Sequence, residues 1–169
     1  MSPIASLRTL DELEQECRGW HRDGLVVVLA NGAFDLLHVG HVRYLAAAKE
    51  LGDRLIVAVN SDASVQASKG PSRPIVPESE RLEILAHLRM VDRLVLFDSK
   101  TVTPVLKRLQ PDIHAKGTDY TTESVPERGV VAAYGGRTVI CGDPKDHATT
   151  DVIRKVFEVY RDRADNRCK

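Results

Sequence analysis

Two histidines at a spacing of three are the side chains in this sequence best suited to chemistry. His38 and His41 flank Gly40, and residues three apart share one face of a helix. Two imidazoles on one face can donate hydrogen bonds to phosphate oxygens and stabilise charge as a phosphoryl centre becomes five-coordinate. Two ordinary surface histidines near a helix start are the plainer interpretation. A zinc site, with Asp35 or His147 as the third ligand, is a further alternative.

The residues just before the histidines suit an anion. Asn31 and Gly32 end an apolar run over residues 25–30, and glycine lets a backbone approach a ligand closely. The amides from Gly32 through Ala33 to Phe34, together with the positive end of the helix that follows, favour negative charge. Asp35 can hold a magnesium ion through water, or it can serve only to form the turn.

Three further polar groups are candidates for the same site. Lys69 opens a loop over residues 69–77 that is rich in proline and glycine, which suits a lid or a substrate loop. A lysine there can swing to meet triphosphate charge, with help from Arg73. The segment from Lys116 to Tyr120 follows a predicted strand at the same sheet edge. The alternatives are a solvated loop lysine at position 69 and, for the second segment, a loop in which Asp119 only forms a turn.

A threonine pair opens the last predicted helix. Thr149 and Thr150 can cap this helix, while a hydroxyl and the exposed amides offer hydrogen bonds to phosphate. Capping alone is the alternative.

The elements that position these groups alternate along the chain. Apolar runs at residues 25–30, 54–60, 93–97, 112–115 and 137–141 predict five strands. Amphipathic stretches between them predict helices, and the first helix is expected over 10–22. Such alternation predicts an α/β fold with a parallel sheet and helices on both faces. The length fits a single domain over 1–169, with residues 1–8 frayed.

Charge and cysteine content exclude several classes. The charges of the 24 basic and 24 acidic side chains cancel. A net charge of zero argues against a protein whose main task is to bind nucleic acid or an anionic membrane. Three scattered cysteines form no CxxC pair, so a reducing cytoplasm is expected. No apolar run approaches the ~20 residues of a membrane span.

The sequence lacks the two common phosphate-binding loops but carries a different nucleotide-binding signature. There is neither a GxGxxG nor a GxxxxGK[ST] motif. The segment 32–41, Gly-Ala-Phe-Asp-Leu-Leu-His-Val-Gly-His, resembles the HxGH signature of cytidylyltransferase-like nucleotidyltransferases. Lys-Gly-Pro-Ser-Arg-Pro at 69–74 and Lys-Gly-Thr-Asp-Tyr at 116–120 resemble the adenylyltransferase domain of bacterial ADP-heptose synthesis, and the likeness extends over about residues 25–157.

The resemblance implies a Rossmann-like three-layer α/β/α fold and a specific reaction. A sugar 1-phosphate attacks the α-phosphorus of ATP, in the presence of Mg²⁺, and gives an ADP-sugar and pyrophosphate. It implies that Lys69 meets the triphosphate, and that Gly117 and Asp119 line the nucleotide or sugar site. Asp35, Arg73 and Tyr120 are expected near the sugar phosphate. The expected partners are these small molecules and further copies of the chain, as a dimer or larger homo-oligomer.

The sequence departs from the family just before the last helix. His147 and Ala148 precede the threonines where relatives carry a serine, and Lys145 is a candidate to replace lost positive charge. The arginine of glycerol-phosphate cytidylyltransferases is missing. A CTP-dependent enzyme acting on a polyol phosphate stays an alternative, as does a non-catalytic nucleotide-sensing domain.

Overall fold

Parallel strands form one sheet in the order β1-β4-β3-β2-β5-β6 within the described residues. The structure, a computed structural model, describes residues 5–144 and 148–165, and only the backbone of 162–165. The strands are β1 (Ser6–Leu7), β2 (Val27–Gly32), β3 (Arg54–Asn60), β4 (Arg93–Phe97), β5 (Ile113–Lys116) and β6 (Arg137–Ile140). The helices are α1 (Leu10–Arg22), α2 (Val39–Lys49), α3 (Asp62–Lys69), α4 (Glu78–Ala86), α5 (Thr103–Leu109), α6 (Arg128–Ala133) and α7 (Thr149–Asp165), with a 3₁₀ turn at Thr122–Ser124.

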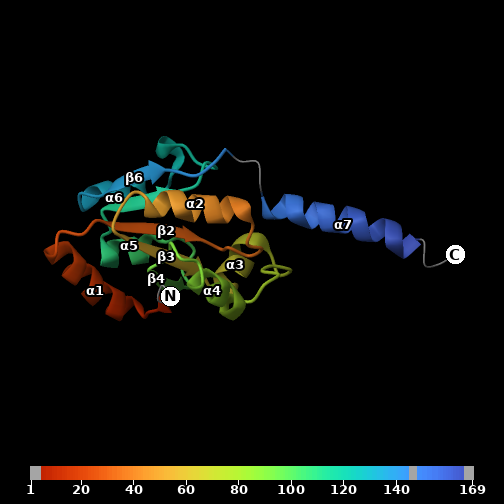
Figure 1. Cartoon of the computed structure of the whole chain (residues 1–169), viewed down its shortest axis with the longest axis horizontal. Helices are drawn as coiled ribbons and strands as arrows, with labels where there is room; N and C mark the ends of the chain where they lie inside the picture. Colours follow the sequence, from red (N-terminus) through yellow and green to blue (C-terminus); the bar gives the residue numbers. More distant parts are fainter. Residues whose placement is uncertain (1–4, 145–147, 166–169) are drawn as a thin grey trace.

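Helices cover both faces of this sheet (Figure 1). Side chains alternate along a strand, so Val28 and Ala30 of β2 pack with α2 and α4, in a cluster that includes Leu45 and Leu85. The next residues along the strand pack against the other face, where α1, α5 and α6 contribute the buried residues Leu13, Cys17, Val105, Leu106, Leu109 and Val131. The predicted three-layer α/β/α architecture is confirmed.

The prediction of five strands is wrong by one edge strand. Ser6 and Leu7 pair in parallel with Arg93 and Leu94 of β4, although residues 1–8 were expected to be frayed. A strand of two residues is too short to give a periodic apolar pattern. It is held by backbone hydrogen bonds such as Arg8 N to Leu94 O at 2.9 Å. Residues 1–4 lie outside the described range.

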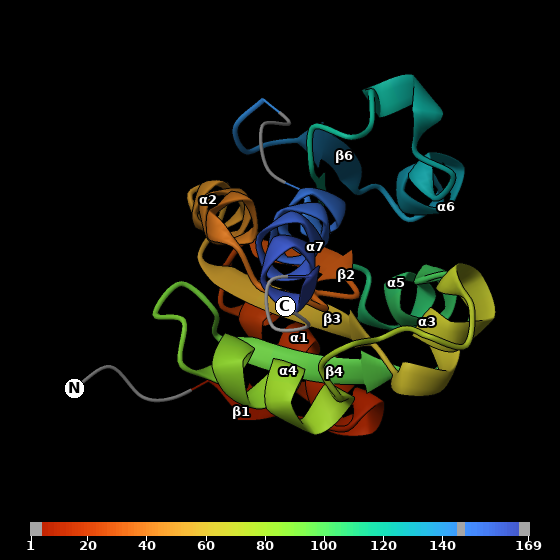
Figure 2. The ribbon, with the colours of Figure 1, turned by 90° about the vertical axis from the view of Figure 1, so that its right-hand side faces the viewer.

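The chain reverses its direction of travel across the sheet between β2 and β5. From β2 it goes outward through β3 to β4, and later returns to build β5 and β6 on the other side. In Figure 2, β2, β3 and β4 lie side by side with β2 nearest the β6 side. The crevice outside the carboxyl ends of strands at such a reversal is where open α/β sheets bind ligands.

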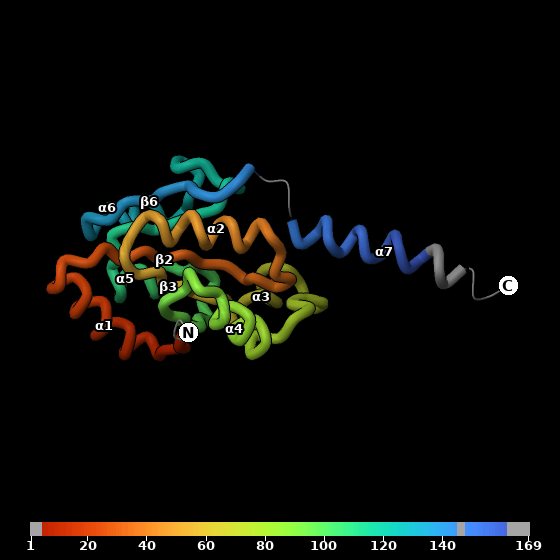
Figure 3. Tube along the Cα trace, in the orientation of Figure 1, coloured from red at the N-terminus to blue at the C-terminus, as the bar shows by residue number. Residues whose placement is uncertain are grey.

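Helix α7 stands apart from the other elements. It extends away from the body in the tube of Figure 3, and its residues Val152, Val156, Phe157, Val159 and Tyr160 are exposed by 39–63%. None of the helices in the described part of the chain has the length and apolar character that a bilayer crossing requires.

Candidate functional site

A cavity of about 500 Å³ lies at the carboxyl ends of β2, β3 and β5. Apart from Arg73, all the residues that the sequence predicts for the site line it. They are Asn31, Gly32, Ala33, Phe34, Asp35, His38, Gly40, His41, Lys69, Lys116, Gly117, Asp119, Tyr120, Thr149 and Thr150. Parallel strands ending at one edge bring these distant segments together, while the roles assigned to them stay predictions.

The turn after β2 is unusually tight. Phe34 adopts a φ of 49°, a left-handed conformation that is strained for an aromatic residue. A Cβ on Gly32 would lie 3.2 Å from the Phe34 ring, so a larger residue would press against that ring. This turn directs the chain into α2 and places the edge of Phe34 against His41, with ring centroids 5.3 Å apart.

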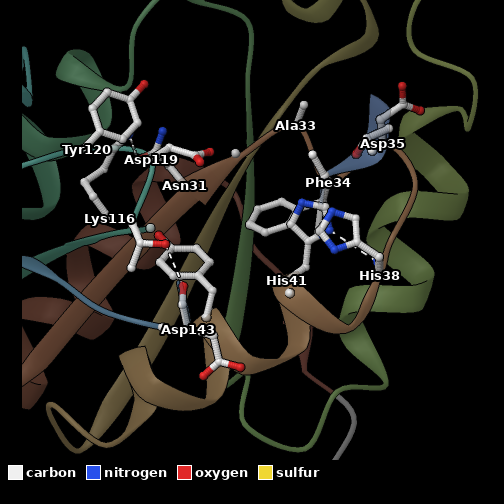
Figure 4. A pocket seen from close by; sticks show the side chains of 18 of the residues that line it. Asn31, Ala33, Phe34, Asp35, His38, His41, Lys116, Asp119, Tyr120 and Asp143 are labelled. Carbon is white, nitrogen blue, oxygen red and sulfur yellow. Dashed lines mark hydrogen bonds between the residues drawn. The ribbon is translucent and has the colours of Figure 1, made fainter. Parts of the chain in front are cut away.

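The two imidazoles stack on each other at the start of α2. The ring centroids of His38 and His41 are 3.9 Å apart and their planes differ by 27°, and Figure 4 shows both rings beside Phe34 on one side of the cavity. The Nδ1 atom of His41 accepts a hydrogen bond from the backbone N–H of His38 at 3.4 Å. The neutral ring of His41 therefore carries its proton on Nε2, which is the donor that it can offer a ligand.

His41 is neutral at physiological pH. Burial, with the nearby charges of His38 and Lys69, lowers its pKa to about 4. The imidazole therefore approaches an anion as a hydrogen-bond donor rather than as a cation. A triphosphate bound beside it would favour the protonated form and raise this pKa again.

Asp35 anchors the 69–77 loop instead of facing the histidines. Its Oδ1 accepts from the backbone N–H groups of Ile75 and Val76 at 2.7 and 2.9 Å, and its Oδ2 accepts from Arg73 Nε at 2.6 Å. Figure 4 shows its carboxylate turned away from the imidazoles. Burial opposes ionisation, but these hydrogen bonds outweigh it and hold the pKa of Asp35 below its usual value.

Two predicted site residues make contacts that the sequence did not predict. Arg73 was expected to assist Lys69 at the substrate, but it pairs with Asp35 and does not line the cavity. Asp35 was expected to hold magnesium through water, and both of its oxygens also accept hydrogen bonds from the 69–77 loop. The loop's arginine and the turn's aspartate form a clamp, a contact over 38 residues of chain that spacing alone does not reveal.

A buried arginine completes this clamp. Arg81 is 1% exposed, donates to Val76 O at 3.0 Å and to the carbonyl of Ala33, and pairs with Asp62 at 2.8 Å. It thereby joins the turn after β2, the 69–77 loop and the start of α3. Lys69, the last residue of α3, lines the cavity, and burial together with the charge of Arg73 lowers its pKa.

The opposite wall of the cavity is built by β5 and the segment after it. Lys116 is buried and lies 4.5 Å from the centre of the Tyr120 ring, and it donates to Asn31 Oδ1 at 3.4 Å. Burial lowers its pKa, although Glu127 and Asp119 favour its charged form. Figure 4 shows Lys116, Asn31 and Asp119 facing the histidines across the cavity.

A third segment closes the cavity near α7. Asp143 pairs with Arg43 of α2 at 2.7 Å, and its backbone carbonyl accepts from Thr118 at 2.6 Å. Thr149 and Thr150 form the first turn of α7 beside it. Lys145 and His147, named as candidates above, lie outside the described residues.

Sequence reasoning missed several lining residues. They are Tyr44, Asn60, Thr118, Cys141, Gly142, Asp143, Pro144 and Ala148. Asn60 closes a correctly predicted strand, so its place at the sheet edge was a usable signal. Tyr44 depends on helix α2 facing the sheet, where its hydroxyl donates to Ala115 O at 2.8 Å.

The described residues do not form a metal centre of their own. No group of three or more His, Cys, Asp or Glu side chains within them has a metal-binding arrangement. Asp35 was predicted to hold magnesium through water, and this role stays a prediction beside its contacts with the loop. Of the two candidates for the third ligand of a zinc site, Asp35 is bonded to the 69–77 loop, and His147 lies outside the described residues.

Comparisons with known proteins identify similar chains. The family described as Cytidylyltransferase-like matches residues 29–163. The "Bifunctional protein HldE" of Syntrophotalea carbinolica is 45% identical over 155 residues, 92% of this chain and 30% of the relative. The protein of that name from Caulobacter sp. is 48% identical over 138 residues, 82% of this chain and 28% of the relative. This chain thus spans about 30% of the first relative's length.

A solved structure shares both fold and sequence with the chain. The crystal structure of the lipopolysaccharide core biosynthesis protein from Thermoplasma volcanium GSS1 superposes with a TM-score of 0.62 at 31% sequence identity. The match covers 72% of this chain and 100% of that chain. The cavity lies where open α/β sheets bind ligands, and the sequence similarity extends over the segments that line it.

Proposed function

Because the chain belongs to the cytidylyltransferase-like family and is a nucleotidyltransferase, we propose that it transfers AMP from ATP to a sugar 1-phosphate. The proposed acceptor is a heptose 1-phosphate, and the products are an ADP-sugar and pyrophosphate. The reaction would supply precursors for lipopolysaccharide or other cell-envelope glycans. The acceptor is suggested by the similarity to a lipopolysaccharide core biosynthesis protein and by the segments 69–74 and 116–120.

One observation carries the proposed chemistry. A stacked histidine pair, of which His41 is neutral, lines the same cavity as Lys69, Lys116 and the first turn of α7. These groups are donors and cations, and Cys141 is not an activated nucleophile because burial raises the pKa of its thiol to about 11. Such a site suits a reaction in which the substrate brings the nucleophile.

The proposed step needs positioning and charge stabilisation. A phosphate oxygen of the sugar 1-phosphate forms a bond to the α-phosphorus of ATP, while the bond from that phosphorus to the bridging oxygen of pyrophosphate breaks. The attacking oxygen is already ionised, so no general base is required. His41 Nε2–H can donate to the oxygens of the five-coordinate phosphorus, and Lys69 can stabilise charge on the departing pyrophosphate.

Magnesium enters the proposal as an ion carried by the ATP phosphates rather than as a resident cofactor. Mg²⁺ commonly binds through substrate phosphates and waters with few protein carboxylates. Because Asp35 is engaged by the 69–77 loop, no step is assigned to a protein-held ion.

A matrix of nucleotides against sugar phosphates, scored by pyrophosphate release, tests the function. We expect turnover with ATP and a heptose 1-phosphate, and much weaker turnover with CTP or with glycerol 3-phosphate. Preferred use of CTP with a polyol phosphate would favour the cytidylyltransferase alternative. Tight nucleotide binding without turnover of any pair would favour a sensing domain.

A further inference from the structure

A buried histidine lies directly beneath the floor of the cavity. His114 of β5 is 0% exposed and does not line the cavity. The register pairs it with Leu29 of β2. Because side chains of one face recur every second residue, Asn31 and Lys116 follow on that same face, nearer the strand ends. His114 therefore lies on the same face of the sheet as these two lining residues, one step further from the strand ends.

The side chains of His114 and Lys116 converge on one atom of Asn31. His114 Nε2 lies 3.0 Å from Asn31 Oδ1, and Lys116 Nζ donates to the same atom at 3.4 Å. An ammonium group only donates hydrogen bonds, so the amide atom that it meets must be the carbonyl oxygen. An oxygen at that position requires the facing nitrogen of His114 to carry a proton.

The protonation state of His114 agrees with this assignment. Burial, with the neighbouring charge of Lys116, lowers its pKa to about 3, so the ring is neutral and has one N–H. The Nδ1 atom has no hydrogen-bond partner within the described part of the chain. The proton is therefore best placed on Nε2, where Asn31 accepts it.

We propose that His114 is a positioning residue that fixes the side-chain amide of Asn31. With the carbonyl end held inward by His114 and Lys116, the NH₂ end is directed into the cavity as a hydrogen-bond donor. Its ligand is an anionic oxygen, carried by either the nucleotide or the sugar phosphate. The identity of these ligands rests on the proposed function, whereas the orientation of the amide does not.

Fixing the amide matters because its two ends have opposite effects on an anion. An NH₂ group donates to a phosphate oxygen, whereas a carbonyl oxygen in the same place repels it. A donor that is already oriented costs no reorganisation when charge develops. His114 thereby acts on the substrate only through Asn31.

Paired substitutions of His114 separate positioning from packing. The amide nitrogen of glutamine can replace Nε2–H as a donor, whereas leucine fills the space without a donor. We expect H114L to lower kcat/KM about 10-fold, the order of one lost hydrogen bond, and H114Q to stay within about 3-fold of the wild type. The control is H87L, since His87 is exposed and its ring nitrogen is bonded to the backbone of Glu83 in its own helix.

A double-mutant cycle with N31A gives the decisive readout. If His114 acts through Asn31, H114L has no further effect on kcat/KM once Asn31 is replaced. The dissociation constant of ATP, measured by calorimetry, and the KM of the sugar phosphate reveal which ligand the amide meets. Independent, additive losses for both ligands would overturn the proposal. So would wild-type kcat and KM in H114L.

Two measurements keep the test independent of turnover. If the wild type turns over no sugar phosphate, the function proposal fails, and the same cycle is read on the dissociation constants of ATP and of the sugar phosphate. Imidazole ¹⁵N shifts report the tautomer directly. We expect His114 to be neutral and protonated at Nε2 from about pH 5 to 8, and a proton on Nδ1 would overturn the proposal even in a fully active enzyme.

Discussion

At the scale of single residues, His41 is expected to be the largest contributor to turnover. Its Nε2–H is oriented by the hydrogen bond that Nδ1 accepts from His38 N, and a preoriented donor stabilises transition-state charge. We expect H41A to lower kcat by roughly 100-fold, the usual cost of one such donor. Steady-state kinetics measure this effect, with H87A as the control. A kcat close to the wild-type value would remove His41 from the mechanism.

The low pKa of His41 makes a second, separate prediction. Since this pKa is about 4 in the free protein, the neutral form is fully populated well above that pH. The ratio of kcat/KM between the wild type and H41A should therefore stay constant from about pH 5.5 to 8. A ratio that falls toward alkaline pH, with a midpoint near 6.5, would mean that the imidazolium is the active form.

His114 should make the folded state sensitive to acid. Its pKa is about 3 when folded and about 6.5 when unfolded, so between these values the unfolded chain binds the extra proton. Its contribution is therefore fully present above pH 6.5 and is lost as the pH falls. Between pH 6.5 and 5 the free energy of unfolding should drop by about 2 kcal/mol from this residue.

Urea unfolding at several pH values measures this acid sensitivity. H114L lacks the titrating group, so its stability should fall less steeply with acid than that of the wild type. Equal slopes for the two proteins would show that His114 is not a buried neutral imidazole.

The sequence predicted which residues lie at the cavity better than it predicted their contacts. The histidine pair, the anion-binding turn and Lys69 were recognisable because their spacing is local. His114 was not, since its partner Asn31 is 83 residues away and only the strand register brings them together. The same reason explains why Arg73 was assigned to substrate rather than to Asp35.

At the scale of elements, the 69–77 loop depends on Asp35. Three donors of the loop converge on this carboxylate, so D35A should free the loop and leave Lys69 poorly placed. We expect a higher KM for ATP and a lower kcat, together with faster hydrogen exchange at the amides of Ile75 and Val76. Exposed Asp98 offers the matched control, D98A. Unchanged exchange and kinetics in D35A would mean that the loop is held by other contacts.

Some elements were predicted to the residue, whereas the first predicted strand, 25–30, lies two residues later as β2. The expected bounds of α1, β3 and β4 match the structure, because each carries a cap or a buried apolar run. β1 was missed because two residues carry no period. The clamp of Asp35, Arg73 and Arg81 was also not predicted. It links the turn after β2, the 69–77 loop and the start of α3, and in the sequence its side chains look like ordinary surface charges.

At the scale of the whole molecule, we propose that the chain assembles with copies of itself through α7. This helix exposes a row of apolar side chains, and it carries charged residues of both signs, among them Asp151, Arg154, Lys155 and Glu158. Light scattering after gel filtration should show a dimer or larger species. V156E combined with F157E should give a monomer, whereas K155E on the charged side should not. A monomeric wild type would contradict the proposal.

The overall architecture was predictable because alternating strands and helices allow few folds. The strand order and the place where it reverses were not visible in the sequence, because they depend on which strands pair across long connections. That reversal is what unites the histidines of α2 with Lys116 of β5 around one cavity.

The central claim is adenylyl transfer at this cavity, and ³¹P NMR of the wild-type protein with ATP and a heptose 1-phosphate tests it most directly. We expect pyrophosphate and an ADP-sugar to form in equal amounts as both substrates disappear, and we expect H41A to form them much more slowly. Formation of ADP and a sugar bisphosphate, or no new phosphorus signal from any nucleotide and sugar phosphate pair, would contradict the account.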